Sequence, residues 1–509
     1  MKILLVNPGH QASLYSMAET ADITGRAAYM PNLALPTLAA LVPDDAEVTI
    51  VDDHIDAIDP FLDQGWDVVG ITGYVSHRDR MFTLAQAFRA RGQLVAIGGP
   101  YATLSSATVR PHADVLFIGE AEHTWPEFLA DLRAGSWKAE YRAATTVDLD
   151  RSPIPAMGAI RNDAYLVGVV QTSRGCPFEC EFCDVIIYLG RNQRYKKPKR
   201  VIAELEQLYQ LGYRDVLLAD DNFTAGRKQA RAILEAIRQW NGSKPEPVLF
   251  TTQLSVDAAR DPELLDLAAA AGLKQAFIGI ETPNQDALRE AKKRQNLRGD
   301  LIANIRSFHT RGIAVQAGII TGFDSDTPAS FRVLLEFLQA AGIPAVLVNM
   351  LVAPEGTPLE RRLRAEDRLR TPDMRDGCTD TNIIPKQMTV AQLRDGTQWL
   401  LNKLYAPDGF LGRLAVLAEH SPTATRGTNG QSLRRFAAMW QNLMRAFEGL
   451  GPEFRRVPRE AVKLFHGKDG SGLGTALITC VQNVRVLQKQ GLWDAALARL
   501  EAPDFTSLQ

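Results

Sequence analysis

Apolar and polar positions follow two alternating periods along the first 149 residues. Runs of continuous apolar and β-branched residues are separated by segments such as residues 80–92 and 124–135, in which apolar positions recur at helical spacing. Strands buried on both faces and joined by helices are typical of a parallel sheet covered by helices on both sides. The pattern therefore predicts a doubly wound α/β domain over residues 1–149. Its five predicted strands are residues 2–7, 47–52, 67–74, 93–99 and 114–120.

After residue 149 the spacing of apolar residues divides the chain into three further segments. Residues 150–165 contain Pro153 and Pro155 without a periodic apolar pattern, which predicts an extended linker. Residues 166–375 repeat a strand and an amphipathic helix, which predicts a partial (β/α)6 barrel with its chemistry at the carboxyl ends of the strands. Residues 376–509 keep only the three-to-four spacing of helices, so we expect an α-helical C-terminal domain. The six predicted barrel strands are residues 167–173, 215–220, 247–255, 275–281, 314–322 and 345–352.

The composition is that of a globular protein and gives no indication of nucleic-acid binding. The 509 residues are 46% hydrophobic and 23% charged, and the net charge of −2 gives no electrostatic case for binding nucleic acid. No apolar run reaches the ~20 residues of a membrane span, and the first run breaks too early, at Pro8 and Gly9, for a secretory signal. We therefore expect a cytoplasmic protein without a transmembrane segment. A surplus of Lys and Arg from residue 381 onward leaves peripheral contact with a membrane open.

Three of the five cysteines lie together in the run SRGCPFECEFCDV. Cys176, Cys180 and Cys183 have C-x3-C-x2-C spacing, and three thiolates can hold three irons of a [4Fe–4S] cluster while leaving the fourth iron open. A zinc site or three unrelated cysteines are the alternatives; zinc would need a fourth ligand, and no histidine lies between His123 and His309.

The spacing, with Phe182 directly before the third cysteine, resembles the radical SAM superfamily. This resemblance implies a [4Fe–4S] cluster whose open iron binds S-adenosylmethionine (SAM), in a reducing compartment where disulfides are rare. The two remaining cysteines, Cys378 and Cys480, are isolated in the sequence and are given no role.

The ends of later barrel strands also resemble radical SAM motifs. The resemblance implies that Asp220 or Asp221 accepts a charge-assisted hydrogen bond from the methionine ammonium of SAM. It also implies that Glu281 binds the ribose and that residues 318–324 lie alongside the adenine. Strand-end acids are also common as helix N-caps, which is the structural alternative. Gln253 departs from the pattern, because an acidic residue is expected there. The predicted SAM-binding residues are Phe182, Asp220, Asp221, Glu281, Gly318, Ile320, Gly322 and Pro354.

The N-terminal sheet, placed before the barrel, resembles the cobalamin-binding domain of cobalamin-dependent radical SAM enzymes. Parallel sheets bind ligands beyond the carboxyl ends of their strands, and no G-x-G-x-x-G fingerprint favours a dinucleotide. The D-x-H-x-x-G signature is absent, so we interpret His54 as a loop residue, expect base-off cobalamin, and expect residues 74–78 to cover its lower face. The predicted cobalamin-binding residues are Pro8, Gly9, Thr72, Gly73, Tyr74, Gly98, Gly99, Pro100, Gly119 and Glu120.

The whole layout resembles one branch of cobalamin-binding radical SAM proteins with an uncharacterised helical C-terminal domain, which includes hopanoid C-methylase-like enzymes. The resemblance implies a methyltransferase acting on an unactivated carbon of a small molecule or lipid, with an electron donor such as flavodoxin or ferredoxin. Another transfer, such as aminocarboxypropyl transfer from SAM, a rearrangement or ring contraction, and a cobalamin or redox sensor are the alternatives. The basic tract 191–200 is either a solvated loop or a docking site for an acidic partner.

Overall fold

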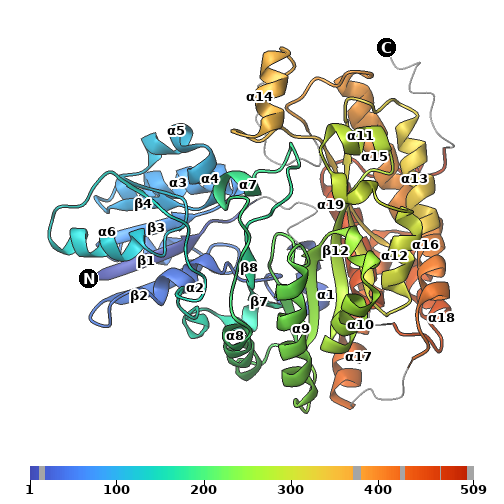
Figure 1. Ribbon diagram of the computed structural model, residues 1–509, viewed down its shortest axis with the longest axis horizontal. Coiled ribbons are helices and arrows are strands. Elements are labelled where there is room, and N and C mark those ends of the chain that lie inside the picture. The colour runs from blue at the N-terminus through green and yellow to red at the C-terminus, as the bar shows by residue number, and fades with distance from the viewer. Residues whose placement is uncertain (11–17, 371–379, 425–429, 471, 501–509) are drawn as a thin grey trace.

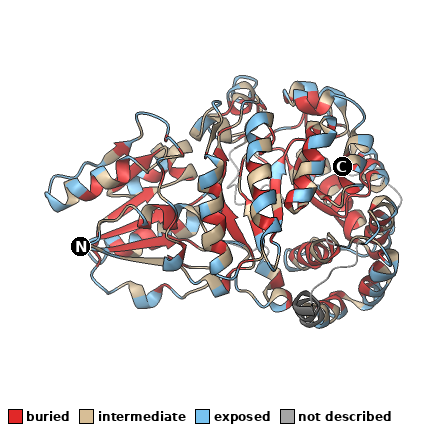
Figure 2. Ribbon diagram, turned by 60° about the horizontal axis from the view of Figure 1, so that its bottom comes forward, coloured by how far each residue is buried: buried red, intermediate tan, exposed pale blue. Residues whose placement is uncertain are grey.

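The structure is a computed structural model, and it describes residues 1–10, 18–370, 380–424, 430–470 and 472–500. Two lobes lie side by side, each built around a six-stranded parallel sheet (Figure 1). Buried residues lie in the strands of both sheets and along the helix faces that cover them (Figure 2). None of the helices in these ranges is both long and apolar enough to cross a bilayer.

The N-terminal sheet has the strand order β2-β1-β3-β4-β5-β6. Its strands are β1 (Lys2–Asn7), β2 (Glu47–Asp52), β3 (Val68–Thr72), β4 (Val95–Gly98), β5 (Val115–Ile118) and β6 (Glu140–Arg142), and its helices are α2 (Ala34–Ala39), α3 (Arg78–Arg89), α4 (Pro100–Leu104), α5 (Ser106–Val109) and α6 (Thr124–Arg133). The short helix α1 (Ala21–Thr24), between β1 and α2, lies instead against the other lobe (Figure 1). All five predicted strands are present, and β6 is an additional edge strand. The chain leaves β1 for β2 on one side and β3 on the other, and this reversal opens a crevice at the carboxyl ends of the strands.

Both faces of this sheet are covered, because successive side chains of a strand point to opposite faces. Leu4 and Val6 of β1 belong to one apolar cluster together with Leu84 of α3. Ile3 and Leu5 belong to the other cluster, with residues of α2 and α6. Continuous apolar strands therefore fold here as a doubly wound sheet, as the sequence predicts.

The second sheet, in the order β14-β13-β12-β11-β10-β7, forms the predicted partial barrel. Its strands are β7 (Gly168–Val170), β10 (Asp215–Leu218), β11 (Leu249–Leu254), β12 (Leu273–Glu281), β13 (Ala314–Thr321) and β14 (Ala345–Met350), and its helices are α7 (Val185–Tyr188), α8 (Pro198–Gln210), α9 (Arg227–Gly242), α10 (Pro262–Ala271), α11 (Gln285–Glu290), α12 (Leu301–His309), α13 (Ser330–Ala341) and α14 (Pro358–Ala365). The predicted strand 167–173 is divided, because its last residue pairs in a separate hairpin of β8 (Ser173–Arg174) and β9 (Arg194–Tyr195).

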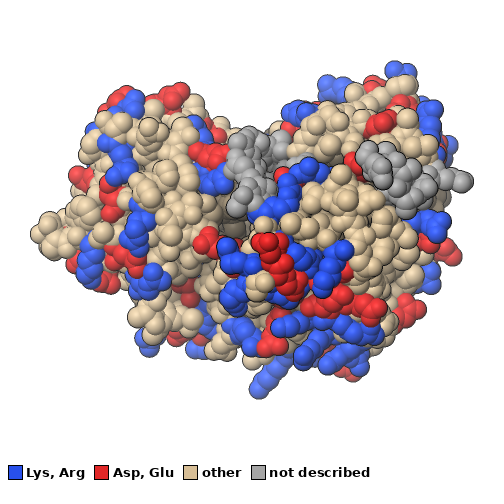
Figure 3. Space-filling model, turned by 90° about the horizontal axis from the view of Figure 1, so that it is seen from above, with Lys and Arg blue, Asp and Glu red and all other residues tan. Residues whose placement is uncertain are grey.

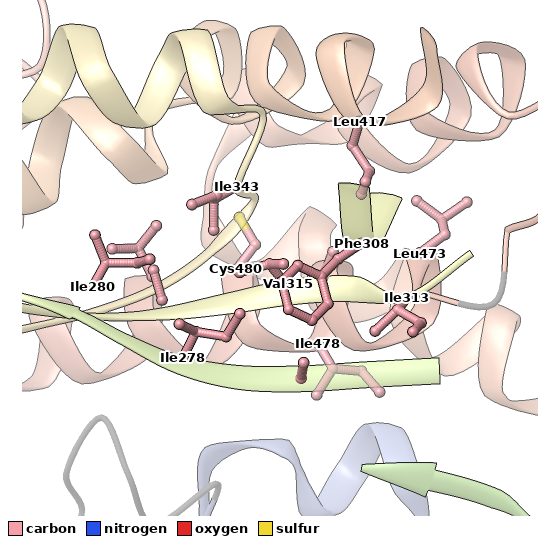
Figure 4. Close-up of a cluster of buried hydrophobic side chains, with 14 of the residues drawn as sticks. Ile278, Ile280, Phe308, Ile313, Val315, Ile343, Leu417, Leu473, Ile478 and Cys480 are labelled. Carbon is pink, nitrogen blue, oxygen red and sulfur yellow. The ribbon is translucent and has the colours of Figure 1, made fainter. Parts of the chain in front are cut away.

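The C-terminal region is helical, as predicted. It consists of α15 (Val390–Tyr405), α16 (Pro407–His420), α17 (Gly430–Leu450), α18 (Val457–Leu464) and α19 (Leu473–Lys489). Ile478 and Cys480 of α19 lie in the same apolar cluster as Ile278 of β12 and Val315 of β13 (Figure 4). Cys480 is completely buried and acts as a small apolar residue, whereas Cys378 lies outside the described residues.

The N-terminal lobe also reaches the C-terminal helices. The short helix α1 packs against α17, and the preceding 3-10 turn η1 (Ala18–Thr20) packs against α19 (Figure 1). Arg485 of α19 donates two hydrogen bonds to the carboxylate of Asp22, at 2.7 and 2.9 Å. The segment between β1 and α2 is thus held against the C-terminal helices by residues far apart in sequence.

Candidate functional site

A cavity of about 620 Å³ lies between the two sheets. The carboxyl ends of β1, β3, β4 and β5 line one side, and β7, β10 and β11 line the other. Apolar side chains such as Leu33, Val169 and Leu217 line it together with many polar and charged groups, among them Gln253 at the position where the sequence departs from the expected acid. This arrangement can enclose a large ligand between two domains.

Most residues predicted to bind cobalamin meet at this cavity. Thr72, Gly73, Tyr74, Gly98, Gly99, Pro100, Gly119 and Glu120 line it, whereas Pro8 and Gly9 do not. Gly99 has φ +92°, and a side chain there would collide with the hydroxyl of Thr72. A β-carbon at Gly73 would lie 2.8 Å from that of His77. The glycines therefore allow neighbouring strand ends to pack closely, which leaves an open face of backbone toward the cavity.

Three histidines that the sequence interpretation did not connect meet at the same edge. His10, His54 and His77 follow β1, β2 and β3, and the rings of His10 and His54 are 4.4 Å apart in an edge-on contact. Burial, followed by the neighbouring imidazoles, lowers the pKa of His77 to about 4. The sequence did contain a signal for this cluster, because a histidine follows each of three consecutive strands.

The ring nitrogens of two of these histidines already have partners. Nδ1 of His77 accepts a hydrogen bond from the backbone N–H of Tyr74 at 3.1 Å, so its proton resides on Nε2 when the ring is neutral. In His54, Nδ1 lies 3.1 Å from Oδ1 of Asp52, and Nε2 accepts from the backbone N–H of His10 at 3.3 Å. These bonds leave neither ring with a free lone pair.

A buried ion-pair network joins the lobes beside the cavity. Arg174 donates to Glu120 and Glu122 at 2.7 and 2.6 Å, and Arg194 donates to Glu120 at 2.8 Å. Although burial raises the pKa of Glu120, Arg174 and Arg194 lower it below its ordinary value. Glu120, predicted as a cobalamin contact, therefore also serves as an inter-lobe ion pair.

The basic tract 191–200 is mostly engaged in internal contacts. Lys196 pairs with Glu204 at 2.7 Å, and both side chains are almost fully buried. Arg200 donates to the carbonyl of Ser152. On the face of the molecule seen from above, Lys and Arg lie interspersed with Asp and Glu (Figure 3). These contacts favour the interpretation of the tract as a structural loop.

The cysteine loop follows the short strand β8, just after β7, and continues into α7. Burial is the main factor that raises the pKa of the Cys176 and Cys183 thiols, that of Cys183 to about 12, and the charge of Cys180 adds to both shifts. Such thiols stay protonated until a metal displaces the proton. Three cysteines within one short loop match the three-thiolate donor set of an open-iron [4Fe–4S] cluster.

The two acids after β10 have different environments. Asp220 is 2% exposed and accepts hydrogen bonds from the hydroxyl of Thr172 and the backbone N–H of Ser173, so it holds the cysteine loop onto β10. Asp221 lines the cavity and accepts one hydrogen bond from the N–H of Gly175 at 3.0 Å. Of the pair, Asp221 is the carboxylate with room to accept from a ligand ammonium.

We expect SAM affinity to depend on the ionisation of Asp221. Burial raises the pKa of Asp221 to about 6, so its carboxylate becomes protonated, and SAM binds more weakly, as the pH falls from 7 to 5. Asp221→Asn should weaken SAM binding at pH 7.5 about tenfold or more, the size of one charge-assisted hydrogen bond, and remove this pH dependence. Equilibrium dialysis of radiolabelled SAM against the cluster-loaded protein measures both the affinity and its pH dependence. Equal affinity of variant and wild type would show that Asp221 only holds the cysteine loop through the N–H of Gly175.

The other predicted SAM residues lie around the far side of the cysteine loop. Phe182 and Ile320 pack against one apolar cluster, and the rings of Phe182 and Phe323 are 6.3 Å apart. A β-carbon at Gly318 would lie 3.1 Å from the ring of Phe277. Gly322, at φ +100°, faces Leu393 of α15, and a β-carbon there would lie 2.8 Å from it. Gly322 thus accommodates the C-terminal region.

Two further residues of this set have structural partners. The carbonyl of Pro354 accepts from the hydroxyl of Thr357, the N-cap of α14, at 2.7 Å. Glu281 has φ +63°, an uncommon conformation for a residue other than glycine, at a bulge between β12 and β13. Its carboxylate accepts from Nζ of Lys293 at 2.6 Å, a partner that the sequence interpretation missed.

Two family models match the chain. The model described as "Radical SAM superfamily" matches residues 170–338, and the model described as "Domain of unknown function (DUF4070)" matches residues 357–450. The first range includes all three clustered cysteines and the strand ends from β10 to β13. The second range begins at α14 and ends with α17.

Two curated relatives align over most of the chain. A Synechocystis protein named "Uncharacterized methyltransferase sll1242" is 34% identical over 421 residues, which cover 81% of this chain and 78% of that protein. The "Hopanoid C-2 methylase" of Rhodopseudomonas palustris is 31% identical over 456 residues, covering 87% of this chain and 85% of that protein. Both alignments therefore extend well beyond the barrel.

Two solved structures have the same fold. TsrM from Kitasatospora setae, a radical SAM methyltransferase solved with cobalamin and a [4Fe–4S] cluster bound, has a TM-score of 0.59 at 16% identity and covers 91% of this chain and 99% of its own. OxsB, a cobalamin-dependent SAM radical enzyme solved with aqua-cobalamin and SAM bound, has a TM-score of 0.62 at 15% identity, covering 96% of this chain and 79% of its own. These likenesses confirm the predicted architecture.

Proposed function

The chain belongs to the cobalamin-binding branch of the radical SAM superfamily that carries a DUF4070 region, and we propose that it is a C-methyltransferase acting on an unactivated carbon of a small molecule or lipid. Its cofactors are a [4Fe–4S] cluster, SAM and cobalamin. The observation that carries the proposal is the cavity between the two sheets, because eight of the ten predicted cobalamin residues and Asp221 line it together.

When bound, the cluster supplies the electron that cleaves SAM, and cobalamin supplies the methyl group. The protein's own residues hold and orient these groups. Cys176, Cys180 and Cys183 would hold the cluster, and Asp221 would orient the SAM ammonium. The open backbone at Gly73 and Gly99 would support the flat face of the corrin. Most of the exposed lining area is apolar, which would suit an apolar substrate or the corrin ring.

The electron that starts the reaction must come from outside the chain. We propose a small redox protein such as a flavodoxin or ferredoxin as its donor. Because the basic tract 191–200 is largely engaged in internal ion pairs, we do not assign the docking site to it.

Cobalamin binding is the test of this proposal. Protein supplied with hydroxocobalamin should retain about one corrin per chain after desalting, with a base-off absorption and EPR spectrum. His54→Ala should leave the cobalt spectrum unaltered, because both ring nitrogens of His54 have partners within the protein. Nitrogen hyperfine splitting that disappears in His54→Ala would contradict this prediction.

Two outcomes separate methyl transfer from the alternatives. Incubation with methyl-labelled SAM and a cell extract should place the label on carbon in one product. Failure to retain corrin, in protein that still cleaves SAM, would overturn the methyltransferase proposal and favour another radical transfer or rearrangement.

A further inference from the structure

The segment between α11 and α12 passes behind the cysteine loop and carries two polar side chains toward it. Lys293 has a side chain that is 13% exposed, and its Nζ lies 2.6 Å from Oε1 of Glu281 and 6.0 Å from the ring centroid of Phe182. The ammonium interacts electrostatically with Cys180 and Cys183. It is thus a largely buried positive charge held beside Phe182, the residue directly before the predicted cluster ligand Cys183.

The second side chain is Gln295. It is 4% exposed, and its Nε2 donates to Sγ of Cys180 at 3.7 Å. Its Oε1 has no hydrogen-bond partner within the described part of the chain, which leaves an acceptor available beside the cluster loop. Because Nε2 is committed to the sulfur, the amide is oriented as a donor to a cluster ligand.

The next residue fixes this geometry. Asn296 is 2% exposed, and its side-chain amide donates to the carbonyls of Gly279 and Ile280 at 2.8 and 2.9 Å. These carbonyls directly precede Glu281, whose carboxylate accepts the hydrogen bond from Lys293. A chain of buried contacts therefore fixes the position of the Lys293 charge.

We propose that Lys293 and Gln295 form an outer shell that raises the reduction potential of the cluster. Reduction adds one negative charge to the cluster, and a nearby cation and an N–H donor to a cluster thiolate both stabilise that added charge. The effect is large in a buried site, where charges are poorly screened. This inference rests on the proposed cluster, and it assigns positioning and electrostatic roles rather than contact with substrate.

The test is the reduction potential of the reconstituted cluster, measured by EPR-monitored titration without SAM. Lys293→Gln should shift the potential to a more negative value, and Lys293→Arg should restore it toward wild type. Glu281→Gln removes a negative charge from the same pair and should shift the potential in the opposite direction. General damage to the site would not give shifts of opposite sign.

Lys292→Gln is the matched control, because it removes the same charge from the adjacent, exposed lysine. It should leave the potential at the wild-type value. Gln295→Leu, which removes the N–H donor without changing charge, should lower the potential by less than Lys293→Gln. Equal potentials for the Lys292 and Lys293 variants, or shifts of one sign for Lys293→Gln and Glu281→Gln, would overturn the proposal.

Loss of Lys293 leaves Glu281 buried without its partner, so the single variant can fail to fold. The double variant Glu281→Gln/Lys293→Gln has no unpaired charge, and it should have a lower potential than Glu281→Gln alone. The same preparations are assayed for SAM cleavage. Unchanged potentials in variants of a protein that assembles a cluster and cleaves SAM refute this inference alone, whereas a wild-type protein that assembles no cluster refutes the proposed function as well.

Discussion

Cys180→Ala is expected to abolish SAM cleavage, and so are Cys176→Ala and Cys183→Ala. An open-iron cluster has only three protein ligands, so the loss of one leaves two thiolates and no stable site for SAM. Wild-type protein reconstituted without oxygen should bind about four irons per chain with a broad visible absorption. Deoxyadenosine and methionine, separated by chromatography after reduction of the cluster, measure the cleavage.

Cys480→Ala is the control for these variants. Cys480 is completely buried among apolar side chains of the barrel and α19 (Figure 4), far in sequence from the cluster loop. Its replacement removes one sulfur from the core and should leave iron content and SAM cleavage near wild type. Undiminished deoxyadenosine formation in any of the three cluster variants would refute the radical SAM assignment of the site.

The sequence predicted the elements because their patterns are local. The continuous apolar runs 2–7 and 47–52 coincide with β1 and β2, and the three-to-four spacing of apolar residues predicted the helical character of the C-terminal region. The β8–β9 hairpin was missed because its strands are too short for a periodic signal. Three cysteines within eight positions likewise placed the cluster loop without any knowledge of distant contacts.

The partners of the site residues could not be predicted, because they come from elsewhere in the chain. Glu120 was assigned from its place at a strand end, but its ion pairs come from Arg174 and Arg194 of the other lobe. Gly322 matched a ligand motif, yet Leu393 of the C-terminal region occupies the space beside it. Lys293 lies outside any strand-end motif, and only the fold brings it to Glu281.

The network around Arg174 gives the second large prediction. Arg174→Met should destabilise the protein without cofactors by about 3–5 kcal/mol, because it leaves the buried carboxylate of Glu122 without its cation. The network contributes stability at neutral pH that is lost as the pH falls, since the folded-state pKa of Glu120 is lowered. Urea unfolding at pH 7.5 and at about pH 4, which lies below the ordinary glutamate pKa of 4.5, measures both effects, and the difference between variant and wild type should shrink at the lower pH.

Arg151→Met is the matched control, because Arg151 is 85% exposed and its carboxylate partner, Asp148, lies 3.7 Å away on the surface. Exposed pairs contribute about 0–1 kcal/mol, so this variant should unfold at nearly the wild-type urea concentration. Because Arg174 joins the two lobes beside the cavity, its loss should also reduce the corrin retained after desalting, which Arg151→Met should not. Equal stability of the two variants would show that the lobes are held together by their apolar contacts and the Asp22–Arg485 pair, and that the Arg174 network is dispensable.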